Sequence, residues 1–270
     1  MKIGFLGGGN MAEALIAGMV KGDFRPQDIL AADISVDRLD YLEASYGLRR
    51  AEARDLLLES DAVILAVKPQ ILPQVLPGLA GDISPDTLII SIAAGISLKD
   101  LEILSGSRRI IRVMPNTPAL VGYGVSVLSK APLGTVQKAD EALAQQIFSA
   151  VGDALWLEEE QMDAVTALSG SGPAFVYRFA DAMAESGVLM GLTRDLSSRL
   201  AVGTLLGAAM MLKENPDSPR TLESKVTSPG GTTIHGLAAM EKNNFSNSVK
   251  EGILAAVQRS RELGKTKNRE

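Results

Sequence analysis

Cysteine is absent from the 270 residues of the sequence, and histidine occurs once. The lack of cysteine excludes disulfides, thiolate zinc sites and cysteine nucleophiles, and it suits a reducing compartment. Excess positive charge is also lacking, since the net charge is −5, which disfavours nucleic acid or an anionic membrane as a partner. The longest apolar run, residues 200–212, is too short to span a bilayer, which takes about 20 residues. We therefore expect a soluble, cytoplasmic protein without a metal site.

Short apolar runs alternate with helical patterns in the first half of the chain, which predicts a parallel α/β sheet. Several runs are apolar at consecutive positions, as expected of strands that helices cover on both sides. The predicted strands are residues 2–6, 29–32, 62–67, 88–92 and 110–113, followed by 125–128 and 154–157.

Helical patterns dominate after residue 160, and strand-like runs disappear. The predicted helices are residues 162–168, 173–190, 194–213, 232–241 and 246–263. We therefore expect two domains, a doubly wound α/β domain over residues 1–160 and an all-helical domain over residues 161–270.

The apolar helix around residues 200–212 carries Gly203 and Gly207, which are four positions apart and share one face. Small residues on one face allow close contact between helices, either inside a monomeric core or between subunits. We favour the subunit interface, because a domain of about 110 residues has little chain of its own to cover this face. A homodimer, or a higher homo-oligomer, is the expected assembly.

A glycine-rich turn follows the first predicted strand and precedes a helical pattern. Residues 7–12 read GGGNMA, a match to G-x-G-x-x-A. In that motif Gly7 allows the tight turn, Gly9 lets the backbone approach a pyrophosphate, and Ala12 lets helix and strand pack closely. Because the strand, the helix and a second strand are all present, the context favours a Rossmann dinucleotide site over a turn without a nucleotide. The predicted contacts of this turn are Gly7, Gly8, Gly9, Asn10 and Met11.

Asp33 ends the second predicted strand, where a carboxylate can accept hydrogen bonds from the adenosine ribose. This position favours NADH over NADPH, because a 2′-phosphate would meet a like charge. Ser35 and Arg38 lie just downstream and could hold a phosphate if Asp33 turned aside. A helix-capping role for Asp33 is the alternative.

Three further loops follow predicted strands and so lie at the edge where open α/β sheets bind ligands. Each alone is compatible with ordinary loop chemistry, but together with the glycine turn they describe a crevice. The predicted cofactor contacts in these loops are Ala66, Val67, Lys68 and Pro69, then Ala93, Ala94 and Gly95, and finally Asn116.

Two loops rich in glycine and hydroxyl residues, 166–173 and 227–233, each enter a helix of the second domain. Such a loop exposes backbone N–H groups at the positive end of the helix dipole, where a small carboxylate can bind. The alternative is that both are generously capped helices.

The sequence resembles pyrroline-5-carboxylate reductase, the last enzyme of proline biosynthesis, along essentially its whole length. The resemblance is carried by GFLGGGNMAEAL at 4–15, AVKPQ at 66–70, SIAAGIS at 91–97, RVMPNTPALVGYG at 112–124, DAVTALSGSGPAF at 163–175 and SPGGTTIHGL at 228–237. The last two segments discriminate far better than the glycine turn.

This resemblance implies reduction of 1-pyrroline-5-carboxylate to L-proline with hydride from NAD(P)H, and a helical domain that intertwines with that of a second subunit. It implies that Ser228, Gly230, Gly231, Thr232 and Thr233 bind the substrate, with Thr233 nearest the ring nitrogen. Glu159 and Thr166 would support the nicotinamide end, and Thr166 joins Thr233 as a catalytic candidate. One departure is Glu52-Ala53-Arg54, where family members often have an asparagine that helps hold the adenosine.

His235 invites a general-acid role, but it follows the start of a helix and has Ile234 and Leu237 as core-like neighbours. We expect it to pack or hydrogen-bond instead. Three alternatives stay open: a β-hydroxyacid dehydrogenase, a reductase of another imine, and a dinucleotide-sensing module without catalysis. The first would place a lysine early in the helix after residue 172, where this chain has Arg178.

Overall fold

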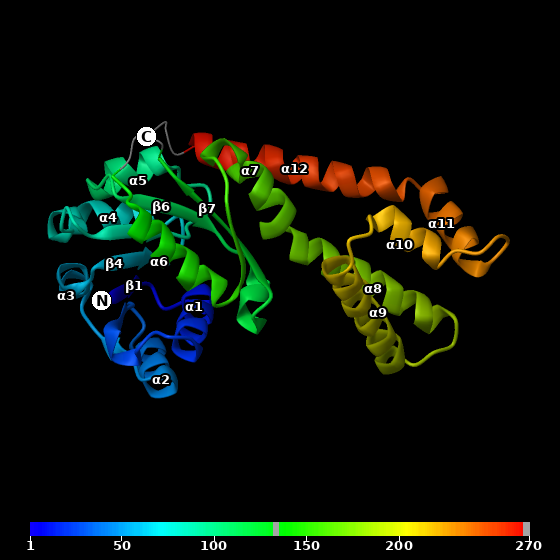
Figure 1. Cartoon of the computed structure of the whole chain (residues 1–270), viewed down its shortest axis with the longest axis horizontal. Helices are drawn as coiled ribbons and strands as arrows, with labels where there is room; N and C mark the ends of the chain where they lie inside the picture. Colours follow the sequence, from blue (N-terminus) through cyan, green and yellow to red (C-terminus); the bar gives the residue numbers. More distant parts are fainter. Residues whose placement is uncertain (132–134, 267–270) are drawn as a thin grey trace. The chain divides into compact units, whose positions relative to one another are not determined.

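The computed structural model describes residues 1–131 and 135–266, and it divides into two compact units (Figure 1). The first unit comprises Met1–Ser171 together with the chain from Ala256 onward, and the second is Gly172–Ala255. We expected the division near residue 160. It falls later because residues 162–170 bond to the first unit, where the Asn116 amide donates to the carbonyl oxygen of Ser169 over 3.1 Å.

Eight strands in the described part of the chain form one sheet. They are β1 (Ile3–Leu6), β2 (Ile29–Ala32), β3 (Arg49–Arg50), β4 (Ala62–Leu65), β5 (Leu88–Ser91), β6 (Ile110–Met114), β7 (Gly124–Lys130) and β8 (Gly152–Trp156). Their order is β3-β2-β1-β4-β5-β6-β7-β8, which contains the 3-2-1-4-5-6 order of dinucleotide-binding sheets. The seven predicted strands are therefore present, with small differences at their ends. The short, charged β3 was not predicted.

Strand β7 departs from the expected parallel sheet, because it pairs antiparallel with β6. The connection between the two strands, residues 115–123, is shorter than the dozen or more residues that a parallel crossover needs. A helix then links β7 to β8, and this pair is parallel.

Helices cover both faces of the sheet, as the prediction of a doubly wound fold required. One face carries α1 (Asn10–Lys21), α2 (Val36–Tyr46) and α6 (Lys138–Ser149), and the other carries α3 (Ala53–Glu59), α4 (Leu72–Leu79) and α5 (Leu98–Ser105).

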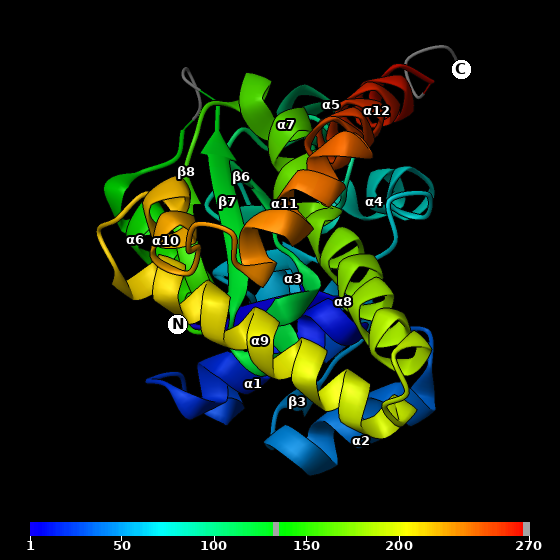
Figure 2. The same ribbon diagram turned by 90° about the vertical axis from the view of Figure 1, so that its right-hand side faces the viewer.

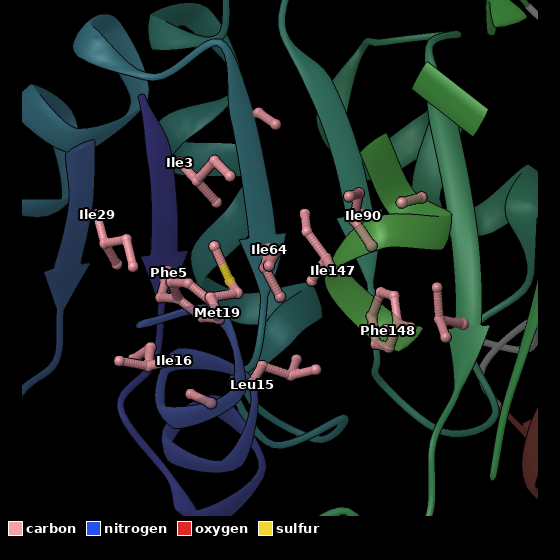
Figure 3. Close-up of a cluster of buried hydrophobic side chains, with 14 of the residues drawn as sticks. Ile3, Phe5, Leu15, Ile16, Met19, Ile29, Ile64, Ile90, Ile147 and Phe148 are labelled. Carbon is pink, nitrogen blue, oxygen red and sulfur yellow. The ribbon is translucent and has the colours of Figure 1, made fainter. Parts of the chain in front are cut away.

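Side chains that alternate along a strand enter these two cores. In β1, Phe5 packs in the core that contains Leu15 of α1 and Phe148 of α6, whereas Leu6 packs in the core of α3 to α5. Figure 3 shows the first of these cores, with Phe5, Leu15 and Phe148 among its labelled side chains. Each large apolar side chain buried in this way stabilises the fold by about 1.5–3 kcal/mol. The two cores together hold the strands in place, and with them the sheet edge from which the loops emerge.

The chain after residue 160 is helical, as predicted. Short α7 (Met162–Val165) runs into a π-helical turn (Thr166–Gly170), followed by α8 (Gly172–Leu189), α9 (Arg194–Glu214), α10 (Pro219–Lys225), α11 (Thr232–Lys242) and α12 (Phe245–Thr266). Figure 2 shows α8 and α9 joined at their tight connection. Thr193 caps α9 by accepting from the N–H of Leu196, and α10 was not predicted.

The second unit leaves much of its apolar surface uncovered by its own chain. On α9, Leu206 is 61% exposed, although Ala201 is buried. Around Gly203 and Gly207, no atom of the described residues outside the adjoining backbone of α9 and the two chain neighbours lies within 4 Å of where a Cβ would stand. The close helix contact expected at these glycines is therefore not made within the chain. Separately, in residues 1–131 and 135–266 we find no helix long and apolar enough to cross a membrane.

Candidate functional site

The glycine turn lies between the ends of three adjacent strands. Gly7 donates its N–H to the carbonyl oxygen of Ala32 over 2.8 Å. Its φ is 103°, an angle that residues other than glycine rarely adopt. A Cβ at Gly7 would stand 2.8 Å from the backbone of Ala66 and Val67. The loop after β4 is therefore packed directly against this turn, and only glycine fits between them.

Gly9 presents the opposite situation, since the space around it is open. Within the part of the chain that the structure describes, no atom beyond Gly9 and its two chain neighbours lies within 4 Å of a Cβ built on Gly9. Gly9 is the N-cap of α1, with Asn10 and Met11 opening the helix and Ala12 fully buried beneath it. Free N–H groups and the positive end of the helix dipole meet at this opening, an arrangement suited to a phosphate.

Asp33 lies beside the same turn. Its Oδ2 accepts from the N–H of Gly8 over 2.7 Å, and its Oδ1 accepts from the N–H of Ser35 over 2.9 Å. The carboxylate thus fastens the glycine turn to the end of β2. The alternative predicted for Asp33 was to cap the next helix. Ser35 has that role, because its hydroxyl accepts from the N–H of Arg38 at the start of α2.

The loops after β4 and β5 reach the same edge, because β1, β4 and β5 follow one another in the sheet and run parallel. Lys68 is exposed, and its carbonyl oxygen accepts from the N–H groups of Ile71 and Leu72. Ala93 is buried, Ala94 is exposed, and Gly95 turns the chain with a φ of 70°. With Pro69, these residues lie at the same edge of the sheet as the glycine turn.

Asn116 is buried and bonds within the protein. Its Oδ1 accepts from the N–H of Val125 over 2.8 Å, and its Nδ2 donates to the carbonyl oxygen of Ser169. Its side chain therefore holds the loop after β6 to the π-helical turn.

The π-helical turn replaces the end of the helix predicted at 162–168. Thr166 donates its hydroxyl to the carbonyl oxygen of Met162 over 2.7 Å, and Ser169 donates to that of Val165. Such bonding back to the preceding turn bends helices, and π-helical turns are frequent at functional sites. Because the Thr166 proton is engaged, its hydroxyl oxygen is left to accept a hydrogen bond.

Glu159 links three parts of the first unit. Its Oε1 accepts from the N–H of Leu98 over 2.7 Å and from the guanidinium of Arg112 over 2.9 Å. Arg112 is buried on β6, so this ion pair is largely sheltered from water. Glu159 thereby holds the start of α5, directly after the loop that contains Gly95. No pattern in the sequence indicated this role for Arg112.

The SPGG segment of the second unit is a tight turn. Gly231 donates its N–H to the carbonyl oxygen of Ser228 over 3.0 Å, with Pro229 second and Gly230, at a φ of 70°, third. This is the residue pattern of a type II turn. A Cβ at Gly231 would stand 2.4 Å from the Ser228 hydroxyl and 3.2 Å from the Ser228 carbonyl oxygen, so a larger residue there would require the Ser228 side chain to move.

Helix α11 begins at Thr232, immediately after this turn. Its N-cap, Gly231, has no side chain to accept from the first-turn N–H groups, which are left for a ligand or water. Thr232 and Thr233 are exposed. The turn and the helix start therefore offer backbone donors and hydroxyls on one short segment.

His235 bonds to the same turn, since its Nδ1 lies 2.9 Å from the carbonyl oxygen of Gly231. A carbonyl only accepts, so Nδ1 carries the proton. The histidine thus steadies the cap of α11. Of the two neighbours expected to be core-like, Ile234 is 43% exposed and Leu237 is partly buried within this chain.

Known protein families match this chain. Residues 159–263 match the family model described as pyrroline-5-carboxylate reductase dimerisation, and residues 2–95 match the model described as NADP oxidoreductase, coenzyme F420-dependent. A pyrroline-5-carboxylate reductase from Synechocystis is 42% identical over 98% of this chain and 99% of the relative. The chain belongs to the pyrroline-5-carboxylate reductase family.

Solved structures agree with this membership. A pyrroline-5-carboxylate reductase from Coxiella burnetii superposes with a TM-score of 0.90 at 36% identity, covering 97% of this chain and 98% of the other. The Plasmodium falciparum pyrroline carboxylate reductase with NADP bound gives 0.87 at 33% identity, covering 98% of each chain. As a pyrroline-5-carboxylate reductase family member, this chain is an NAD(P)H-dependent oxidoreductase. The alternatives of a β-hydroxyacid dehydrogenase and a sensing module are thereby disfavoured.

Proposed function

We propose that this chain reduces 1-pyrroline-5-carboxylate to L-proline, with the dinucleotide on the first unit and the imine at the SPGGTT segment. One observation carries the proposal: this family member has two features suited to the two ligands. The glycine turn at the sheet edge suits the dinucleotide, and the start of α11, which no side chain caps, suits the imine carboxylate. When bound, NAD(P)H supplies the hydride.

The residues at the sheet edge fit a dinucleotide. A pyrophosphate would occupy the open space at Gly9, which any larger side chain would fill. Around it, we assign adenosine contact to Asp33 and rim contacts to the loops after β4, β5 and β6. The assigned residues are Gly7, Gly8, Gly9, Asn10, Met11, Asp33, Ala66, Val67, Lys68, Pro69, Ala93, Ala94, Gly95 and Asn116.

We assign Glu159 and Thr166 to the nicotinamide end of the site, with different roles. Glu159 acts as a positioning residue, because its carboxylate already holds Leu98 and Arg112. Thr166 offers an acceptor oxygen, because its proton is donated to Met162.

The substrate is assigned to Ser228, Gly230, Gly231, Thr232 and Thr233. The N–H groups around Gly230 and Gly231 suit the carboxylate, and the hydroxyl of Thr233 suits the ring nitrogen. A protonated imine is already electrophilic, so the protein's task is orientation and charge stabilisation rather than strong acid–base chemistry.

A homodimer through the second unit completes the proposal. Side chains on α9 that a partner would cover include Leu200, Val202, Leu206 and Met211, each more than half exposed. Residues 161–270 then serve as the substrate-binding and dimerisation region. Cytoplasmic localisation and a preference for NADH remain predictions of this proposal.

A substrate panel tests the proposed function. Oxidation of NADH and NADPH is followed with 1-pyrroline-5-carboxylate, with other cyclic imines, and in reverse with β-hydroxyacids and NAD. The proposal expects turnover with 1-pyrroline-5-carboxylate well above the rest. Faster turnover of another imine, or of a β-hydroxyacid, would contradict it.

A further inference from the structure

A network of charged and phenolic side chains closes the glycine turn on its adenosine side. Arg38, from the first turn of α2, donates through Nε to the carbonyl oxygen of Gly8 over 2.5 Å. Its Nη2 forms an ion pair with Glu13 of α1. The guanidinium also lies over the ring of Tyr41, 5.1 Å from its centroid. Arg38 is thus held on the turn from three sides.

Glu13 is the fixed end of this network. One carboxylate oxygen accepts from Arg38, and the other accepts from the hydroxyls of Tyr41 and Tyr46, each over 2.9 Å. The side chains of Arg38 and Glu13 are only 24% and 19% exposed, so water screens the pair less than a surface pair. Two phenols and one guanidinium therefore determine where the Glu13 carboxylate lies.

The titration behaviour of the network agrees with a stable ion pair. Burial by itself would raise the pKa of Glu13, but hydrogen bonds from Arg38, Tyr41 and Tyr46 outweigh it and hold the pKa below its ordinary value. Burial and the neighbouring Glu13 carboxylate raise the pKa of Tyr46 to about 12. Glu13 is consequently ionised, and Tyr46 is a donor, throughout the physiological range.

The charge balance at this end of the site opposes a 2′-phosphate. An arginine near the end of the second strand is the usual partner of that phosphate, and an acidic residue there is the usual partner of a free ribose. Here Arg38 is neutralised by Glu13 and turned onto the carbonyl oxygen of Gly8. Asp33, and Asp37 in the first turn of α2, leave an excess of negative charge.

We propose that Glu13 is a specificity-determining positioning residue, which selects NADH over NADPH by fixing Arg38 on the glycine turn. The inference deepens the proposed function and rests on its dinucleotide site. Glu13 need not touch the cofactor. Arg38 is the cation that α2 carries. Its guanidinium is held by Glu13 and by the carbonyl oxygen of Gly8, so it cannot reach a 2′-phosphate.

Binding of adenosine 5′-monophosphate and of 2′,5′-ADP, which differ only by the 2′-phosphate, is followed by calorimetry and tests this role without catalysis. The measured quantity is the ratio of the two affinities, in which general damage to the site cancels. Glu13→Gln should raise the ratio in favour of 2′,5′-ADP by about 10-fold or more, the effect of one charge-assisted hydrogen bond. Glu43→Gln, which removes a carboxylate of α2 paired with Arg50, is the matched control and should leave the ratio within about twofold.

Glu13 could act by positioning Arg38 or by repelling the 2′-phosphate with its own charge. Arg38→Gln, alone and combined with Glu13→Gln, distinguishes the two. Arg38→Gln alone should leave the ratio nearly unchanged, because the locked guanidinium does not serve the phosphate. In the Arg38→Gln background, Glu13→Gln should lose most of its effect. A large drop in the ratio for Arg38→Gln alone would overturn the proposal, and this test stands even if Glu13→Gln fails to fold.

The remaining outcomes are equally decisive. An unchanged ratio in folded Glu13→Gln would refute the role of Glu13, and an undiminished gain without Arg38 would show that Glu13 acts by its own charge. If the unmodified protein binds neither nucleotide, the dinucleotide site of the proposed function fails instead.

Discussion

Thr233 and His235 are close neighbours on the first turns of α11, yet the contacts of their side chains differ. His235 bonds to the carbonyl oxygen of Gly231, within its own turn. Thr233 is exposed, at a helix start whose cap residue is a glycine. The histidine therefore supports the turn, whereas the threonine hydroxyl is available to a substrate.

Replacing Thr233 by alanine should reduce kcat/KM for the imine by roughly 10- to 150-fold, which corresponds to about 1.5–3 kcal/mol for one lost bond to a polar or charged group. NADH affinity should hardly change. If the hydroxyl acts only in the transition state, kcat falls at nearly constant KM, and if it only binds, KM rises alone. His235→Asn is the comparison and should be mild. Unaltered kinetics for Thr233→Ala beside an inactive His235→Asn would reverse the two roles.

Asp33 gives a second prediction at the scale of one side chain. Asp33→Ser should shift cofactor preference toward NADPH by about 1–2 kcal/mol, because it removes a negative charge beside the proposed ribose position. Since Asp33 also accepts from Gly8 and Ser35, absolute affinity will fall for both cofactors, and the ratio of kcat/KM values is the quantity to compare. A strong NADPH preference in the unmodified enzyme, unaffected by the substitution, would refute this role.

At the scale of helices and strands, the sequence predicted most of the fold because its signals are local. Consecutive apolar residues marked the buried strands, and Gly7 marked the turn. The antiparallel pairing of β7 escaped prediction because the apolar pattern within a strand does not encode the direction of its neighbour. The partners of Arg112 and Glu13 escaped because each lies far along the chain, at Glu159 and Arg38. No local pattern encodes such pairs.

The start of α6 depends on a sheltered ion pair that can be tested by stability. Asp140 is buried and accepts from Arg109 over 2.6 and 2.8 Å and from the N–H of Gln137. Burial alone would raise the pKa of Asp140, but these bonds outweigh it and the pKa is lowered. The stabilisation is therefore present above the unfolded-state pKa of about 4 and is lost as pH falls through the folded-state pKa.

Asp140→Asn should lower the free energy of unfolding at pH 7 by about 1.5–3 kcal/mol, and the deficit should shrink in acid. Urea unfolding at pH 7 and below pH 4 measures both. Asp40→Asn removes a more exposed pair with Arg50 and should cost no more than about 1 kcal/mol. A deficit at Asp140 that is equal at both pH values would contradict the account.

At the scale of the whole molecule, the uncovered face of α9 predicts an obligate dimer. Leu206→Glu would place a charge on that face and should give a smaller species in sedimentation at low micromolar concentration, with loss of activity. Leu58→Glu is a matched control, since Leu58 is 67% exposed on α3 of the first unit. A Leu206→Glu monomer with full activity would refute the obligate dimer.

The central claim is hydride transfer from a nicotinamide to the ring of 1-pyrroline-5-carboxylate, and isotopic labelling tests it most directly. With NADH deuterated at both C4 positions, the account predicts L-proline carrying one deuterium at the ring carbon bonded to nitrogen that was the imine carbon, detected by mass spectrometry and NMR. Proline without deuterium at that carbon, or cofactor oxidation without proline, would contradict it.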